Sequence, residues 1–138
     1  MENKVIGVYV VDDHPILREG VKTILSKIDD AEFVGEASSG QEVLDKLSEI
    51  DCDVMLLDIS MPGMTGIELL DHLKGKKPEM AILMLSFHSG KYFADLCLKS
   101  GALGYLSKAS APSELDAAIH AVAQGNIFVG SDNPWWWK

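Results

Sequence analysis

The chain has 138 residues, a formal net charge of −9 and a hydrophobic content of 47%. This length suits one domain with a core of its own, and the composition is ordinary for a globular protein. The acidic balance argues against direct binding of nucleic acid by this chain, and no apolar run is long enough to span a bilayer.

The cysteines and the N-terminus give no sign of export. Cys52 and Cys97 lie far apart and fit no metal-binding spacing, so we interpret them as reduced, partly buried hydrophobes. Residues 1–4 lack the features of a signal peptide. Together these observations predict a cytoplasmic protein.

Strand-like and helix-like segments alternate along the chain. Short apolar runs rich in β-branched residues indicate buried strands, and apolar residues at helical spacing indicate helices. In chain order we expect a strand at 5–11, a helix at 15–28, a strand at 33–37, a helix at 39–50, a strand at 54–57, a helix at 67–74, a strand at 80–85, a helix at 92–100, a strand at 103–106 and a helix at 115–124.

Local signals mark several helix ends. Pro15 suits the first turn of a helix. Ser39 to Glu42 has the form of a capping box. Gly101 and Gly125 are placed to end the last two helices.

Five successive strand-helix units predict an α/β fold with a parallel sheet between two layers of helices. Right-handed crossovers leave few topologies, and the simplest is the flavodoxin-like (βα)5 sandwich with strand order 2-1-3-4-5. We expect this domain to span residues 1–125, with 126–138 as a C-terminal tail or truncated linker.

Three carboxylates are predicted to meet at one edge of this sheet. Asp12 and Asp13 follow the first strand, and Asp58 follows the third, which is its neighbour in the expected order. Ligands bind such sheets at the carboxyl ends of the strands. Because like charges raise each other's pKa, the cluster needs a reason, and a hard divalent cation is one.

Four stretches resemble the receiver domain of two-component response regulators, most like the NarL/FixJ (LuxR-type) subfamily. They are Val-Asp-Asp-His-Pro at 11–15, Leu-Asp-Ile-Ser-Met-Pro-Gly-Met-Thr-Gly at 57–66, Leu-Ser at 85–86 and Gly-Tyr-Leu-Ser-Lys at 104–108. Each alone is weak evidence. Together, in the family's order and each at a strand end, they are highly specific.

The resemblance implies a phosphorylation site. Asp58 would accept a phosphoryl group from a sensor histidine kinase. Asp12, Asp13 and Asp58, with the backbone carbonyl of Ser60, would hold Mg²⁺ or Mn²⁺. Oxygen ligands of this kind suit Mg²⁺, and a carboxylate is a competent nucleophile for a phosphoryl intermediate.

The resemblance also implies a switch. Ser86 would hydrogen-bond a phosphoryl oxygen, and Lys108 would pair with Asp58 or its phosphate. As Ser86 moves toward the phosphate, Tyr105 would turn inward and reshape the face formed by the fourth helix, fifth strand and fifth helix. Ser60 and His88 are candidates for tuning the rate of phosphate loss.

Each residue also has an ordinary structural interpretation. Asp13 or Asp58 alone could cap a helix or loop, Lys108 could be a solvated lysine, and Ser86 could be a turn residue. His14 is expected to line the cleft without chemistry, whereas His72 and His120 are expected on solvent-facing helix surfaces. Many receivers have proline, often after a cis bond, where this chain has Ala109, which leaves that bond's geometry open.

We therefore predict a phosphorylation-dependent signalling switch, not a metabolic enzyme, that catalyses only its own phosphorylation and slow dephosphorylation. It would control transcription through a DNA-binding helix-turn-helix domain that this sequence does not contain, with a homodimer forming on activation. The alternatives are a phosphorylation-independent dimerisation or docking module, a stand-alone regulator, and a flavin-binding domain. Trp135, Trp136 and Trp137 form either a docking element or an incidental end.

Overall fold

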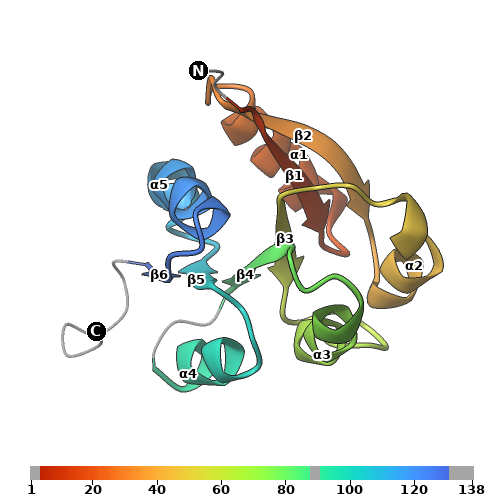
Figure 1. Ribbon diagram of the computed structural model, residues 1–138. Helices are drawn as coiled ribbons and strands as arrows, with labels where there is room; N and C mark the ends of the chain where they lie inside the picture. The colour runs from red at the N-terminus through yellow and green to blue at the C-terminus, as the bar shows by residue number, and fades with distance from the viewer. Residues whose placement is uncertain (1–3, 88–90, 131–138) are drawn as a thin grey trace.

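The computed structural model describes residues 4–87 and 91–130, which form a sheet between two layers of helices (Figure 1). All neighbouring strands are parallel, and the order β2-β1-β3-β4-β5-β6 contains the predicted order 2-1-3-4-5. The strands are β1 (Ile6–Val11), β2 (Ala31–Ala37), β3 (Val54–Asp58), β4 (Ala81–Ser86), β5 (Gly104–Ser107) and β6 (Phe128–Val129).

Helices cover both faces of the sheet. They are α1 (Pro15–Leu25), α2 (Gly40–Asp45), α3 (Gly66–Lys76), α4 (Lys91–Lys99) and α5 (Ala111–Ala123), with a 3₁₀ turn, η1, at Leu47–Glu49. Helices α1 and α5 lie on one face, and α2, α3 and α4 lie on the other (Figure 1). Within the described ranges, no helix is long and apolar enough to cross a membrane.

The sheet separates two apolar cores. Successive side chains of a strand point to opposite faces, so Val8 and Val10 pack toward α1 and α5, whereas Tyr9 and Val11 pack toward the other layer. Strand β3 is buried along its whole length. Burial on both faces explains why these strands appear in the sequence as continuous apolar runs.

The predicted second helix is shorter than expected. Helix α2 ends at Asp45, and the η1 turn that follows keeps Leu47 buried. Because the buried residues of α2 and η1 together have helical spacing in the sequence, the two elements were predicted as one helix. The Ser39 hydroxyl accepts a hydrogen bond from the Glu42 amide, but the Glu42 carboxylate accepts from the Ser38 amide. In a capping box Glu42 would accept from the amide of Ser39, the N-cap residue, but here it accepts from the residue before it, so the predicted capping box is only half formed.

A sixth strand lies beyond the predicted end of the domain. Gly125, at a φ of +85°, reverses the chain after α5, and Phe128 and Val129 then pair in parallel with β5. The Gly130 amide donates to the Tyr105 carbonyl at 3.0 Å. Two residues are too few to show strand periodicity, which is why this element was missed. The three tryptophans lie outside the described residues.

His120 ties α5 to the turn that precedes β2. Its Nε2 lies 2.8 Å from both carboxylate oxygens of Asp30, and its Nδ1 lies 2.8 Å from the backbone oxygen and Oδ1 of Asp116. A neutral imidazole has one N–H donor, so two nitrogens that both face acceptors favour the imidazolium. The pKa of His120 is raised by the Asp116 carbonyl and by Asp30. The expectation of a simple solvent-facing side chain was wrong, because this partner is remote in sequence.

This ion pair predicts a pH-dependent stability. Because the folded-state pKa of His120 is raised, its contribution is complete below the ordinary value of 6.5 and is lost as pH rises through the folded value. We expect the difference in unfolding free energy between the wild type and His120→Gln, measured in urea titrations, to be largest below the ordinary pKa of 6.5 and to shrink as the pH rises above it. The exposed His72→Gln is the control. A difference that does not change with pH would contradict this account.

Candidate functional site

The register of the sheet gathers the predicted residues at the carboxyl ends of its strands. Val11 pairs with Leu57, so Asp12 follows β1 beside Asp58, the last residue of β3. Asp58 pairs with Leu85, which precedes Ser86 at the end of β4. Ser86 pairs with Ser107, and Lys108 comes next. The edge thus carries all four positions, as expected from strands that end together.

Lys108 is the central cation of this cluster. Its Nζ lies 2.9 Å from Asp12 Oδ2 and 3.1 Å from Asp58 Oδ1, and its side chain is only 2% exposed. The ammonium also lies 4.4 Å from the centre of the Phe87 ring. Lys108 is therefore a buried lysine that pairs with Asp58, as the resemblance implied, and the alternative of a solvated side chain does not hold.

Asp58 is held as a buried carboxylate. Its pKa is raised, first by burial and then by the negative charge of Asp12, while Lys108 and the Ser60 amide act in the opposite direction. The Ser60 N–H donates to Asp58 Oδ1 at 3.3 Å. Asp58 Oδ2 is buried and has no hydrogen-bond partner in the part of the chain that the structure describes. A buried carboxylate oxygen without a hydrogen bond is costly, so this oxygen favours a ligand that supplies positive charge.

The donor set fits a divalent cation. Asp12, Asp13, His14 and Asp58 each offer a ligand atom, and these atoms lie within 4.8 Å of one another. Asp13 Oδ1 is also buried and accepts no hydrogen bond from the described residues, although His14 Nδ1 lies 3.2 Å away. Carboxylate oxygens are the ligands that Mg²⁺ prefers, so the carboxylates present fit this ion. The Ser60 carbonyl as a further ligand stays a prediction.

His14 lies closer to the acids than expected. Its Nδ1 is 3.0 Å from Asp12 Oδ1 and 3.2 Å from Asp13 Oδ1, although the side chain is exposed. Its amide also donates to Asp12 Oδ1 at 2.9 Å. The sequence placed His14 in the cleft but gave no sign that it would face both carboxylates, because that depends on the bend of the loop.

Gly66 brings α3 against the backbone of Asp58. A Cβ at this position would lie 2.2 Å from the Asp58 carbonyl oxygen, which leaves no room for a side chain. The Gly66 amide donates to the Ile59 carbonyl at 2.8 Å, and Thr65 and Glu68 form a reciprocal capping box. The absence of a side chain at Gly66 therefore lets α3 pack directly against the Asp58 backbone.

Of the remaining candidates for switching and tuning, the structure describes Ser86 and Tyr105 but not His88. Ser86 and Tyr105 are buried, and Tyr105 is a fully enclosed member of the core on the α3 and α4 side. His88 lies outside the described residues. The Lys108–Ala109 peptide bond is trans, which settles the geometry that the sequence left open.

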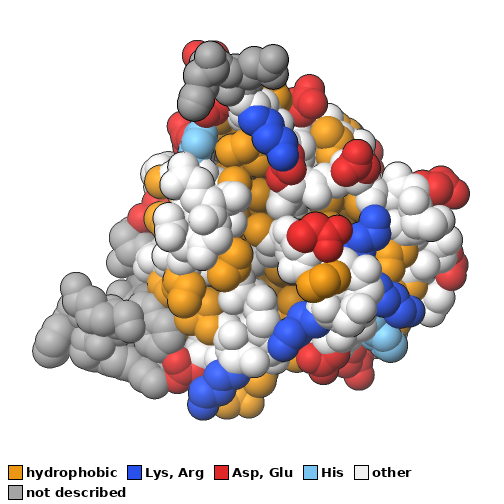
Figure 2. Space-filling view, in the orientation of Figure 1, with side chains coloured by type: hydrophobic (Ala, Val, Ile, Leu, Met, Phe, Trp, Pro, Cys, Tyr) orange, Lys and Arg blue, Asp and Glu red, His pale blue; other side chains and the backbone are white. Residues whose placement is uncertain are grey.

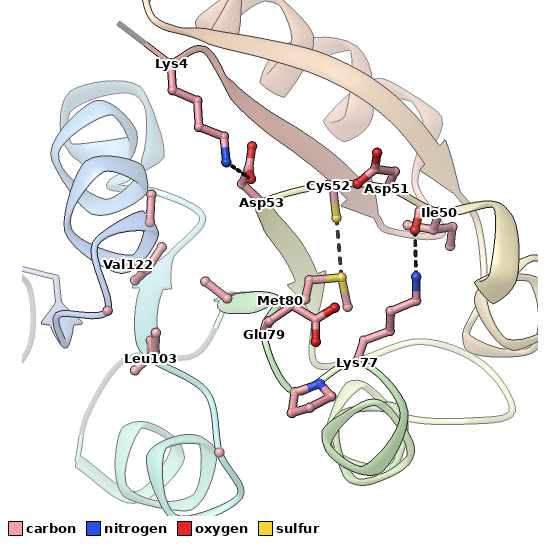
Figure 3. Close-up of a pocket in the computed structure, with 15 residues that line it drawn as sticks. Lys4, Ile50, Asp51, Cys52, Asp53, Lys77, Glu79, Met80, Leu103 and Val122 are labelled. Atoms are coloured by element: carbon pink, nitrogen blue, oxygen red, sulfur yellow. Dashed lines mark hydrogen bonds and ion pairs between the residues drawn. The ribbon is translucent and has the colours of Figure 1, made fainter. Parts of the chain in front are cut away.

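A pocket lies at the opposite side of the sheet, at the amino ends of its strands (Figures 2 and 3). Its volume is about 620 Å³. Lys4 pairs with Asp53 at 3.1 Å, and Lys77 donates to the Ile50 carbonyl at 3.0 Å, so both ammonium groups already have protein partners. Burial raises the pKa of Cys52, beside this pocket, to about 12, which keeps the thiol protonated.

Comparison with known proteins gives the class to which this fold and acidic edge belong. The response regulator receiver domain family matches residues 8–120. The nitrate/nitrite response regulator protein NarL of Escherichia coli K12 is 40% identical over 120 residues, which cover 87% of this chain and 56% of NarL. The transcriptional regulatory protein UhpA of the same strain is 41% identical over 128 residues, covering 92% of this chain and 63% of UhpA.

The fold comparison agrees. The crystal structure of a LuxR-family two-component response regulator from Aurantimonas sp. SI85-9A1 superimposes with a TM-score of 0.88 at 32% identity, over 94% of this chain and 92% of that one. The chain therefore belongs to the receiver-domain family of two-component response regulators, within its NarL/LuxR subfamily. It spans little more than half the length of NarL.

The charge of Asp58 predicts a stabilising substitution. Since burial and Asp12 raise the pKa of Asp58, its ionised form opposes folding at neutral pH. We expect Asp58→Asn to raise the unfolding free energy by about 1 kcal/mol at neutral pH without divalent cations. The gain should shrink as the pH falls toward the pKa of Asp58, because the wild type then gains its proton.

Chemical denaturation of both proteins in a metal-free buffer measures this difference. Asp71→Asn on the exposed face of α3 is the matched control and should leave the unfolding free energy within a few tenths of a kcal/mol. A loss of stability in Asp58→Asn would mean that the ionised carboxylate contributes more to Lys108 than it costs to bury.

Proposed function

We propose that this chain is a Mg²⁺-dependent phosphoacceptor switch and that Asp58 receives a phosphoryl group from a sensor histidine kinase. The observation that carries the proposal is the buried Asp58 Oδ2, which has no hydrogen-bond partner in the described residues and belongs to a carboxylate paired with Lys108. The neighbouring Asp12 and Asp13 supply the negative charge that a cation needs.

The chemistry asks little of the protein beyond positioning and charge neutralisation. An Asp58 carboxylate oxygen forms a bond to phosphorus as the phosphorus–nitrogen bond of the phosphohistidine breaks, and the electron pair of that bond stays on the imidazole nitrogen. Asp12, Asp13 and Asp58 would hold the cation, with the Ser60 carbonyl as a further ligand. When bound, Mg²⁺ neutralises charge on the phosphoryl oxygens.

Two further side chains act directly on the phosphoryl group in this proposal. The Lys108 ammonium, already between Asp12 and Asp58, offsets the added negative charge. The Ser86 hydroxyl, at the end of the adjacent strand, donates a hydrogen bond to a phosphoryl oxygen. The protein's only catalysis would be its own phosphorylation and the slow hydrolysis of the aspartyl phosphate, a rate that Ser60 and His88 would tune.

The proposed switch runs from Ser86 to Tyr105. Tyr105 pairs with Met84 in the sheet, two residues before Ser86, and its fully buried side chain corresponds to the inward position. Tyr105 is already inward in this structure, so the proposal is that the phosphoryl group favours the arrangement with Ser86 toward Asp58 and Tyr105 inward over one in which Tyr105 turns outward. It can bias the face formed by α4, β5 and α5 only by binding one arrangement more strongly than the other.

For output we propose control of transcription in the cytoplasm. The support is the likeness to UhpA, whose name describes it as a transcriptional regulatory protein and which is longer than this chain. DNA would be bound through a further domain and a homodimer would form on activation. The buried Asp58 Oδ2, which has no hydrogen-bond partner among the described residues, argues against a docking module that never meets phosphate or a cation.

Phosphorylation is tested by intact-mass spectrometry after incubation with acetyl phosphate and Mg²⁺. We expect the wild type to gain one phosphoryl group, and Asp58→Asn to gain none, because the nucleophile has been removed. Chelation of Mg²⁺ should also abolish the gain. Asp51→Asn, an exposed acid at the opposite edge of the sheet, is the matched control and should behave as the wild type. An undiminished gain in Asp58→Asn would place the phosphoryl group elsewhere.

A further inference from the structure

Arg18 of α1 reaches back to the acidic loop. One terminal nitrogen, Nη1, donates a hydrogen bond to the backbone carbonyl of Asp12, and Nε donates to Glu36 Oε1 of β2 at 2.8 Å. The side chain is only 16% exposed. Arg18 therefore bridges the end of β1 and the neighbouring strand β2.

The carbonyl that Arg18 holds belongs to the peptide that joins Asp12 to Asp13. The Asp12 amide on the other side donates to the Ala37 carbonyl at 3.1 Å. The backbone of Asp12 is thus fixed on both sides, by β2 and by Arg18. If the Asp12–Asp13 peptide were free to rotate, the Asp13 carboxylate would swing away from Asp12 under their mutual repulsion.

The positive charge of Arg18 is balanced by neighbouring carboxylates. Glu36 Oε2 also lies 2.9 Å from Lys22 Nζ, which contacts Glu19 Oε2 at 2.8 Å. Two cations are therefore matched by two carboxylates. An unpaired guanidinium here would repel a metal ion, whereas a paired one can hold the backbone without weakening the cation site.

We propose that Arg18 is a positioning residue for the cation site, and that it fixes the Asp12–Asp13 peptide so that both carboxylates face one metal ion. This inference rests on the proposed function. It requires arginine, because a planar guanidinium can donate to two acceptors on different elements through separate nitrogens, whereas the compact lysine ammonium cannot match that geometry.

The test is a metal titration with the metal alone. Free Mn²⁺ is measured by electron paramagnetic resonance and Mg²⁺ by competition, for the wild type, Arg18→Met, Arg18→Lys and Lys22→Met. We expect both Arg18 variants to raise the Kd for Mg²⁺ about tenfold, as loss of groups that orient metal ligands commonly does. Lys22→Met is the matched control, since Lys22 pairs with the same glutamate but has no contact with Asp12 among the described residues. Its Kd should stay within about twofold.

Unfolding in metal-free buffer separates positioning from general stability, because a merely structural role would move the unfolding free energy and leave the Kd unchanged. Should Arg18→Met fail to fold, Arg18→Lys and Glu36→Gln carry the test. Glu36→Gln releases the guanidinium from β2, so we expect a weaker loss of metal affinity in the same direction, and little additional effect in the Arg18→Lys background.

Three results would overturn the proposal. A Kd in the Arg18 variants equal to that of Lys22→Met would remove the positioning role while leaving wild-type metal binding and phosphorylation intact. Tighter binding in Arg18→Met would show that its charge, not its hydrogen bond, acts on the site. If the wild type binds no divalent metal, the proposed function fails together with this inference.

Discussion

The burial of like charges at one edge of the sheet is the constraint on which the rest of the structure depends. Asp12 and Asp58 are almost fully enclosed at the carboxyl ends of neighbouring strands, and the Lys108 ammonium contacts both. Removal of Lys108 would be costly, because it would leave two buried carboxylates without their shared counterion. The parallel sheet satisfies this constraint by ending β1, β3 and β5 at the same edge.

Support for the acidic edge comes from both helical layers. On one face, α1 supplies Arg18, which holds the Asp12 carbonyl. On the other, α3 begins at Gly66, in direct contact with the Asp58 carbonyl. Arg18 holds the Asp12 carbonyl by a hydrogen bond, whereas the absence of a side chain at Gly66 allows α3 to pack close to the Asp58 carbonyl. Groups on rigid elements give a more precise site than groups held only by loops.

The features of the fold that could be predicted from the sequence were those that local hydrophobic periodicity specifies. Strand runs, helix spacing and the positions of Asp12 and Asp58 after their strands were sufficient to predict the sheet order and the acidic edge. Contacts between remote segments that no motif marked were not predictable. His120 meets Asp30 across ninety positions, whereas the pairing of Lys108 with Asp58 was expected only from the family resemblance. The two residues of β6 were too short to form a pattern.

The pairing of β6 with β5 has a mechanical consequence. The amides of Phe128 and Gly130 are bonded to carbonyls on either side of Gly104, so the backbone that leaves α5 is splinted to the strand that carries Tyr105. A displacement of β5 would therefore be passed directly to residues 128–130 through these two hydrogen bonds.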